Sequence, residues 1–240
     1  MFSDGNNESL LIAPSQRTLS DYVADQLRQG IIVGALKPRQ RLVEEELAAS
    51  MQTSRGPVRD ALRLLEAEGL VVRQSHRGAF VAELTYEDVL EIYSIRELLE
   101  SLAIRFAIQK ASSDQIDELE RLVRTMSEMA NQSYNQFQAT DLDMEFHRTL
   151  CKISGHKRLL TAWESLSAQI RLVVLTHRLH NPADLKERSV AWHEAIVDAI
   201  RQRDEAKALA ELHKHMSGST EWVQRSIEII EQQSGTNAGK

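Results

Sequence analysis

The chain has 240 residues, of which 42% are hydrophobic and 27% are charged, and its formal net charge is −6. This length allows a full hydrophobic core in one large domain or in two smaller ones, so we expect a soluble globular protein. The N-terminal segment lacks the basic start and apolar run of a signal peptide, and no apolar run is long enough for a membrane span, which predicts a cytoplasmic protein without a membrane partner. The single cysteine, Cys151, excludes an intramolecular disulfide framework and is typical of a reducing compartment.

The negative net charge of the whole chain argues against a nucleic-acid binder. The charge is, however, distributed unevenly along the chain. Residues 17–84 contain ten basic and nine acidic side chains, whereas the remainder has a net charge of −7. Such an asymmetry indicates two modules with different partners. We therefore predict one domain at residues 17–82 and a second at residues 85–232. Residues 1–16 and 233–240 are expected to be disordered tails.

Three helices and a hairpin are predicted in the first domain. The segment TLSDYVADQLRQGIIVG has apolar residues at helical spacing and ends at Gly34. ALKPRQRL is predicted to be a connector, and VEEELAASM a short helix. After the turn QTS, the segment SRGPVRDALRLLEAEG predicts a longer helix with Ser54 as its N-cap and Gly69 as its stop. Short helix, turn and longer helix form a helix-turn-helix, and the β-prone runs of LVVRQSHRGAFV predict a wing.

Arginines recur every four residues on the longer helix, so they share one face while apolar residues occupy the other. Arginine in such a position can contact guanine edges or phosphates, and backbone N–H groups at the helix start also favour phosphate. The wing tip can reach a minor groove or the DNA backbone. The predicted DNA-contacting residues are Ser54, Arg55, Arg59, Arg63, Arg77 and Gly78. Taken alone, the three spaced arginines are explained better as a solvated helix face.

From Thr85 onward, apolar residues recur with a period of 3.6 and proline nearly disappears. The segment TYED has the pattern of a capping box and places the domain boundary just before it. The predicted helices span residues 85–110, 113–131, 134–153, 156–179, 183–202 and 204–232. The predicted fold class is therefore mainly α, with an N-terminal winged helix-turn-helix followed by an all-α six-helix bundle.

The segment DMEFHRTL places Asp143 and His147 four residues apart. Positions with this spacing lie on the same helix face, so the carboxylate and the imidazole can reach a single point. His193 and His215 each lie on an apolar stripe of a later helix and are expected to face the interior, where a histidine needs a partner. From spacing alone, hydrogen-bonded core histidines and a surface carboxylate explain these residues better than a metal site does.

The sequence resembles the GntR superfamily of bacterial winged-helix regulators over residues 17–232. LAASMQTSRGPVRDALRLLEAEGLV followed by RGAFV is similar to the DNA-binding signature of that family, and the remainder is similar to the FCD effector domain of its FadR-type branch. The helix count is closest to the six-helix, VanR-like subgroup. One departure is Gly56, where the family more often has threonine, and a glycine there weakens the helix by about 1 kcal/mol. The resemblance implies a homodimeric transcription regulator that binds double-stranded operator DNA, usually a repressor released by a small carboxylic acid.

The resemblance also implies functional residues in the second domain. Three imidazoles and a carboxylate would hold a divalent metal ion, zinc or nickel. The implied metal ligands are Asp143, His147, His193 and His215. Arg96, in the segment SIRELLE, matches an arginine that points into the effector pocket, where it can bind a carboxylate. The alternative for Arg96 is a surface ion pair with Glu100, four residues further on.

An enzyme is not expected, although zinc enzymes also combine three protein ligands with an open position. The sequence contains no His-Glu-x-x-His motif, and none of its histidines has a glutamate three residues before it. Two alternatives from other classes stay open. The second domain is a metal-dependent enzyme in one of them, and in the other it is a dimerisation module or a sensor of the metal itself.

Overall fold

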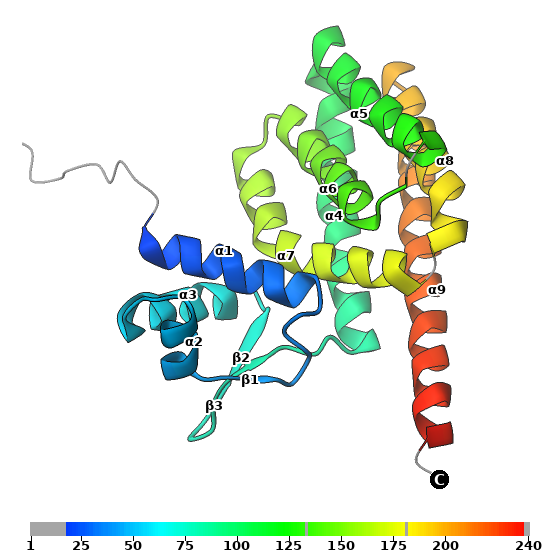
Figure 1. Ribbon diagram of the computed structural model, residues 1–240. Coiled ribbons are helices and arrows are strands. Elements are labelled where there is room, and N and C mark those ends of the chain that lie inside the picture. Colours follow the sequence, from blue (N-terminus) through cyan, green and yellow to red (C-terminus); the bar gives the residue numbers. More distant parts are fainter. Residues whose placement is uncertain (1–17, 133, 181, 238–240) are drawn as a thin grey trace, which may run out of the picture.

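The structure is a computed structural model that describes the backbone of residues 18–132, 134–180 and 182–237, and their side chains except for 177, 179–180, 182–187 and 222–237. In this part of the chain, a small domain of helices and a hairpin stands beside a larger helical bundle (Figure 1). The predicted fold class is confirmed. Among the described residues, no helix has both the length and the apolar character that a membrane crossing requires.

The first domain packs its longest helices and its hairpin around one core. Its elements are α1 (Leu19–Ile32), β1 (Arg41–Leu42), α2 (Glu44–Ser50), α3 (Arg55–Ala67), β2 (Val71–Gln74) and β3 (Gly78–Val81). Thr18 begins α1 through a capping box with Asp21, because each side chain accepts a hydrogen bond from the backbone of the other. The inward face of α3 is fully buried through Val58, Leu62 and Leu65. The opposite face of α3 is not part of this core.

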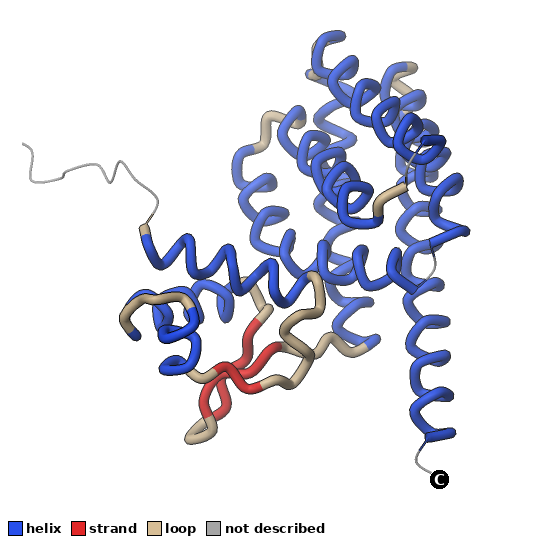
Figure 2. Tube along the Cα trace, in the orientation of Figure 1, coloured by secondary structure: helices blue, strands red, loops and turns tan. Residues whose placement is uncertain are grey.

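The predicted wing forms, with one strand more than expected. β2 and β3 pair antiparallel, with Val71 opposite Val81 and Gln74 opposite Gly78. β1 pairs with the other edge of β3, which gives the order β1-β3-β2 within the described residues (Figure 2). The prediction of ALKPRQRL as a connector was wrong at the two residues of β1. A strand this short has no periodicity of its own and forms because β3 offers unpaired backbone groups.

Helix α3 ends just before the predicted glycine, but its predicted N-cap residue makes no capping hydrogen bond through its side chain. Ser54 has the extended backbone of an N-cap residue, but its side chain makes no capping hydrogen bond to the described residues. Gly69 follows the last turn with φ = +71°, a left-handed conformation that favours glycine. The stop at Gly69 is therefore confirmed, whereas the exposed Ser54 hydroxyl stays free for another partner.

The second domain consists of six long helices in the described residues. They are α4 (Tyr86–Lys110), α5 (Ser113–Gln132), α6 (Gln136–Ile153), α7 (Lys157–His180), α8 (Pro182–Arg201) and α9 (Glu205–Asn237). Thr85 and Asp88 form the capping box predicted from TYED. Helix α9 continues to Asn237, five residues beyond the predicted end of the domain. The helices enclose one continuous apolar core, and four predicted metal-site side chains are buried within it.

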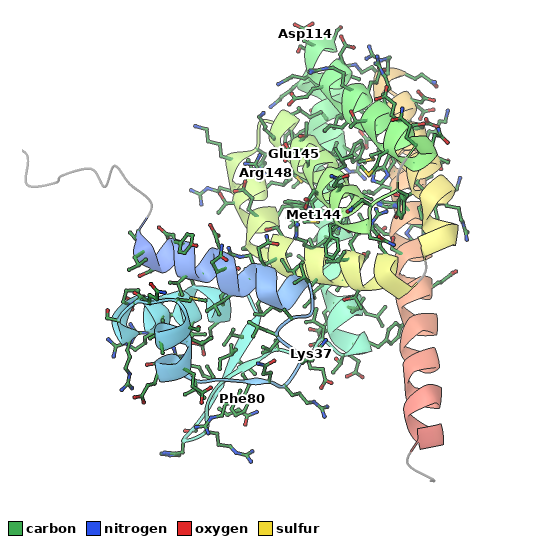
Figure 3. The ribbon with its side chains drawn as sticks, in the orientation of Figure 1. Lys37, Phe80, Asp114, Met144, Glu145 and Arg148 are labelled. Carbon is green, nitrogen blue, oxygen red and sulfur yellow. The ribbon has the colours of Figure 1, made fainter. Side chains whose placement is uncertain are left out.

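Helix α7 joins the two domains. Ala168 is buried in the core of the first domain, and Leu172 packs against the same cluster. A cleft of about 590 Å³ lies beside this seam, between Arg28 and Glu68 of the first domain and helices α6 and α7 of the second. Met144, Glu145 and Arg148 line its α6 side (Figure 3). A single helix of the second domain thus contributes to the core of the first.

Candidate functional site

The outer face of α3 carries the predicted arginines. Arg55, Arg59 and Arg63 are all exposed, opposite the buried apolar face of the same helix. Arg63 Nη1 lies 3.5 Å from Asp60 Oδ1, whereas the described residues give Arg55 and Arg59 no acidic partner. Unpaired guanidinium groups on the second helix of a helix-turn-helix are available for bases and phosphates.

The wing carries two more predicted contact residues at its tip. Arg77 is exposed and lies in the turn between β2 and β3, next to Gly78 at the start of β3. Gly78 has φ = +98°, so the turn needs a residue without a side chain at this position. The tight turn keeps Arg77 at the far end of the hairpin.

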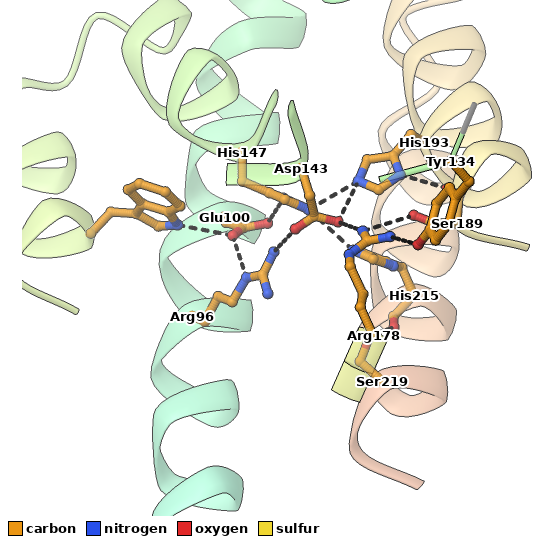
Figure 4. A network of polar contacts seen from close by, with 11 residues as sticks. Arg96, Glu100, Tyr134, Asp143, His147, Arg178, Ser189, His193, His215 and Ser219 are labelled. Carbon is orange, nitrogen blue, oxygen red and sulfur yellow. Dashed lines mark hydrogen bonds and ion pairs between the residues drawn. The ribbon is translucent and has the colours of Figure 1, made fainter. Parts of the chain in front are cut away.

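The four predicted metal ligands come together in the core of the second domain. Asp143 and His147 lie on α6, His193 lies on α8, and His215 lies on α9. All four are buried, and one ligand atom from each lies within 4.8 Å of the others (Figure 4). A surface position for Asp143, the alternative suggested by spacing alone, is therefore wrong. Helices far apart in the sequence bring these residues to one point.

In the neutral form of each ring, the hydrogen bonds of two histidines place the hydrogen on Nδ1 and leave Nε2 bare. His193 Nδ1 lies 2.6 Å from the backbone oxygen of Ser189, to which it can only donate. His147 Nδ1 lies 2.6 Å from Glu100 Oε2 and donates to this carboxylate. The two Nε2 atoms then face each other at 3.2 Å in a buried site. Two lone pairs at this distance repel, and either a metal ion or a proton between them removes the repulsion.

The spacing of the nitrogens fits a divalent ion. His147 Nε2 lies 3.1 Å from His215 Nε2 and 3.2 Å from His193 Nε2. Tetrahedral zinc, with bonds of about 2.0–2.1 Å, holds pairs of nitrogens about 3.3 Å apart. Asp143 Oδ2 and His215 Nδ1 are buried without a hydrogen-bond partner among the described residues, so the ring of ligands is not satisfied by the protein alone.

The protonation states also suit a metal. Burial lowers the pKa of His193 to about 4, although Asp143 acts in the opposite direction. Burial, followed by the nearby His193, lowers the pKa of His215 well below its ordinary value. Burial alone would raise the pKa of Asp143, but Arg178 and other positive neighbours outweigh it and hold that pKa well below its usual range. Neutral imidazoles and an ionised carboxylate are the forms that bind metal ions.

Arg178 on α7 is a central residue that the sequence did not predict. Its Nη2 donates to Asp143 Oδ1 at 3.0 Å and to Ser189 Oγ at 3.3 Å, and its Nη1 donates to the Tyr134 hydroxyl at 3.0 Å. The side chain is buried, so its charge needs the Asp143 carboxylate. A signal was present in the sequence, because Arg178 follows Ile170 and Val174 at intervals of four on an otherwise apolar stripe.

Arg96 forms the predicted alternative pair with Glu100, but in the core. Arg96 Nε donates to Glu100 Oε1 at 2.8 Å, and both side chains are buried. Trp163 Nε1 on α7 donates to the same oxygen at 2.9 Å. Burial alone would raise the pKa of Glu100, but His147 and Arg96 outweigh it and lower that pKa to about 2. Glu100 is therefore ionised, and neither its role nor that of Trp163 was predicted from the sequence.

A small cavity adjoins these residues. Its volume is about 20 Å³, room for a single water molecule. Arg96 Nη2 and Arg178 Nε are buried without hydrogen-bond partners among the described residues, and both arginines line this cavity. Arg96 Nη2 lies 4.0 Å from Asp143 Oδ2, too far for a hydrogen bond. Two arginines thus offer free donors beside the histidine cluster.

Two protein families match the chain. Residues 19–81 match the bacterial regulatory proteins of the gntR family, and residues 91–218 match the FCD domain. Together the matches span both domains of the fold, and the second covers more than half of the chain.

Similar proteins are known from several bacteria. The gluconate operon transcriptional repressor of Bacillus licheniformis is 30% identical over 199 residues, which cover 80% of each chain. The Nta operon transcriptional regulator of Aminobacter aminovorans is 29% identical over 204 residues, 81% of this chain and 91% of that protein. The structure of E. coli McbR/YncC aligns with a TM-score of 0.69 and 24% identity over 91% of this chain and 100% of that one, a likeness of fold.

These relatives and both matched families are regulators, not enzymes, which removes the alternative of a metal-dependent enzyme. The chain belongs to the GntR family of bacterial regulatory proteins, in its branch with an FCD domain, and it is a DNA-binding transcription regulator.

Proposed function

We propose that the protein is a homodimeric repressor whose second domain binds a divalent metal ion, zinc or nickel, and releases DNA when a small carboxylic acid binds beside that ion. The observation that carries the proposal is the close approach of His147 Nε2 and His193 Nε2, 3.2 Å apart in a buried site beside Asp143 and His215. The proposed ligands are Asp143, His147, His193 and His215. When bound, the ion would supply open coordination positions for an oxygen ligand.

The operator contacts follow from the exposed charges of the first domain. Arg55 and Arg59 would reach base edges or phosphates, with Arg63 and the Ser54 hydroxyl beside them. Arg77 and Gly78 at the wing tip would contact the minor groove or the DNA backbone. The exposure of the side chains at these positions supports this assignment.

An anionic effector is supported by the charges around the cavity. Two arginines, Arg96 and Arg178, and two carboxylates, Glu100 and Asp143, balance one another in the core. A divalent ion adds two positive charges, and a buried excess of charge is costly unless an anion offsets it. The free donors Arg96 Nη2 and Arg178 Nε would hold a carboxylate of that anion.

Dimerisation is supported by an exposed apolar stripe on α4. Ile95, Leu98 and Leu102 follow one another at intervals of three and four residues, and Leu98 is 70% exposed. A second copy of the chain, related by a two-fold axis, would cover this stripe and place two reading helices on two half-sites of a pseudo-palindromic operator.

A second candidate, a sensor of the metal ion itself, is favoured by the size of the cavity. About 20 Å³ has no room for an organic acid unless side chains in the wall move. In this candidate function, Arg178 keeps its contact with Asp143 and only the ion changes between states.

Thermal unfolding of the zinc-loaded protein with a panel of small carboxylic acids, repeated after chelation, tests the proposal. A ligand of the native state must raise the midpoint of unfolding, so an acid that acts through the metal gives a shift that chelation abolishes. A midpoint that responds to zinc but to no acid would favour the metal sensor.

Elemental analysis of two variants tests the ligand set. His193→Ala is expected to lose bound metal, because one of four buried ligands is removed. His213→Ala is the matched control on α9, since His213 is exposed and contacts Glu97 instead. Normal metal content in His193→Ala would remove His193 from the site.

A further inference from the structure

We propose that Glu100 is the positioning residue of the metal site, because it fixes which ring nitrogen of His147 carries the hydrogen. This inference rests on the proposed metal site and adds a residue outside the four ligands. Glu100 lies on α4, whereas His147 lies on α6 and Trp163 on α7, so its carboxylate joins three helices at one point. Figure 4 shows Glu100 between Arg96 and His147.

The Glu100 carboxylate accepts three hydrogen bonds, and two of the three donor groups can act only as donors. Glu100 Oε1 accepts from Arg96 Nε at 2.8 Å and from Trp163 Nε1 at 2.9 Å. An indole nitrogen and a guanidinium nitrogen can only donate, so an acceptor is required at Oε1. The second oxygen, Oε2, is left for His147 Nδ1 at 2.6 Å. A carboxylate has no hydrogen to give, so His147 Nδ1 must donate, and in the neutral ring that a metal requires His147 Nε2 is then left bare.

The orientation of the ring decides whether His147 is a ligand. Its Nε2 points at His193 and His215, at 3.2 and 3.1 Å, where the metal would lie. A metal-binding histidine commonly donates its other ring N–H to a carboxylate, which fixes the tautomer and makes the binding nitrogen more basic. Glu100 is the residue in this position. It also holds Arg96, which lines the cavity and has an unpaired Nη2, so one carboxylate orients both a proposed metal ligand and a proposed anion-binding residue.

The substitution Glu100→Gln tests this inference with almost no change in shape. Glutamine has one acceptor oxygen and one NH₂ group, which can only donate. If the oxygen stays with Arg96 and Trp163, the NH₂ group faces His147 Nδ1, and the ring must move its hydrogen to Nε2. If the oxygen turns to His147, the NH₂ group faces two donors. The first arrangement is favoured, because it opposes the amide group to one nitrogen and not to two donors, and it is the arrangement that opposes metal binding.

Zinc affinity is measured by competition with a chelator on metal-free protein. Glu100→Gln is expected to weaken zinc binding by about 10–100-fold, the usual effect of losing such a carboxylate. Trp163→Phe is the matched control, because it removes one donor to Oε1 and leaves the carboxylate and its contact with His147 in place. Its zinc affinity should stay within about threefold of wild type. Equal affinity of Glu100→Gln and wild type would overturn the inference.

A measurement on the wild type covers the case in which Glu100→Gln does not fold. The ¹⁵N chemical shifts of the histidine rings in metal-free protein report the tautomers directly. His147 is expected to carry its hydrogen on Nδ1, and a hydrogen on Nε2 would refute the role of Glu100. The two proposals fail differently. A wild type that binds neither zinc nor nickel contradicts the metal site itself, whereas zinc affinity that is unchanged in Glu100→Gln contradicts only the positioning role.

Discussion

The arginines discussed above form two groups, one exposed on α3 and one buried in the second domain. Arg55 and Arg59 are exposed on α3 without an acidic partner among the described residues, whereas Arg96 and Arg178 are buried against carboxylates. A buried guanidinium is costly unless it is paired, so the inner arginines are tied to the fold as well as to the cavity. The outer arginines contribute little to stability and can be replaced without unfolding the domain.

Arg59→Ala is expected to weaken operator binding by about 1–3 kcal/mol if Arg59 reads a base. The measurement is a titration of operator DNA at fixed salt, because each phosphate contact makes the affinity depend on salt. Arg121→Ala provides the control, since Arg121 is exposed on α5 in the other domain. An operator affinity equal to that of wild type would remove Arg59 from the interface.

Long periodic elements were predictable, whereas single contacts between elements were not. The six helices of the second domain follow the predicted ranges closely, because each repeats its apolar positions over several turns. β1 was missed because two residues carry no period, and it exists only through its pairing with β3. Glu100 entered the sequence analysis only as the alternative surface partner of Arg96, since the sequence shows the spacing but not the burial that comes from packing α4 against α6 and α7.

Helix α4 has one buried face and one exposed apolar face. Its inner face carries Arg96 and Glu100, and its outer face exposes Ile95, Leu98 and Leu102. Exposed apolar residues that form a continuous stripe are typical of an interaction surface. The helix that would join two copies of the chain is thus also the helix that positions His147.

Leu98→Glu is expected to convert the dimer to a monomer. Burying one leucine contributes about 2 kcal/mol, and a two-fold axis uses it twice, so the dimer would weaken by roughly 10³-fold. Analytical ultracentrifugation over a range of concentrations measures this change. Phe137→Glu is the control, because Phe137 is an exposed apolar residue on α6. A Leu98→Glu protein that remains dimeric would place the interface elsewhere.

The two domains touch at a glycine. A Cβ atom placed on Gly69, at the end of α3, would lie 1.6 Å from Gln169 Nε2 on α7. Gln169 is separated by nine residues from Arg178 on the same helix, a distance of about 14 Å along the axis. A ligand that displaced Arg178 would therefore act on helix α7, which also contacts the C-terminal end of α3.

Gly69→Ala is expected to destabilise the protein through two effects. The left-handed backbone costs alanine about 1 kcal/mol, and the clash with Gln169 adds to this. In the Gln169→Ala background, the clash is absent and only the backbone cost should remain. Urea unfolding of the single and double variants measures the difference, since contacting residues show a coupling energy. Equal costs in both backgrounds would contradict the clash and would mean that the end of the Gln169 side chain moves aside without cost.

The burial of Ala168 in the first domain has a consequence for how such regulators can be recombined. The apolar core of the DNA-reading domain is completed by Ala168 and Leu172, which belong to the other domain. A chimera that exchanges whole domains between two relatives would therefore pair a reading domain with a foreign α7 surface. Such an exchange is expected to succeed only when the residues that replace Ala168 and Leu172 match them in volume.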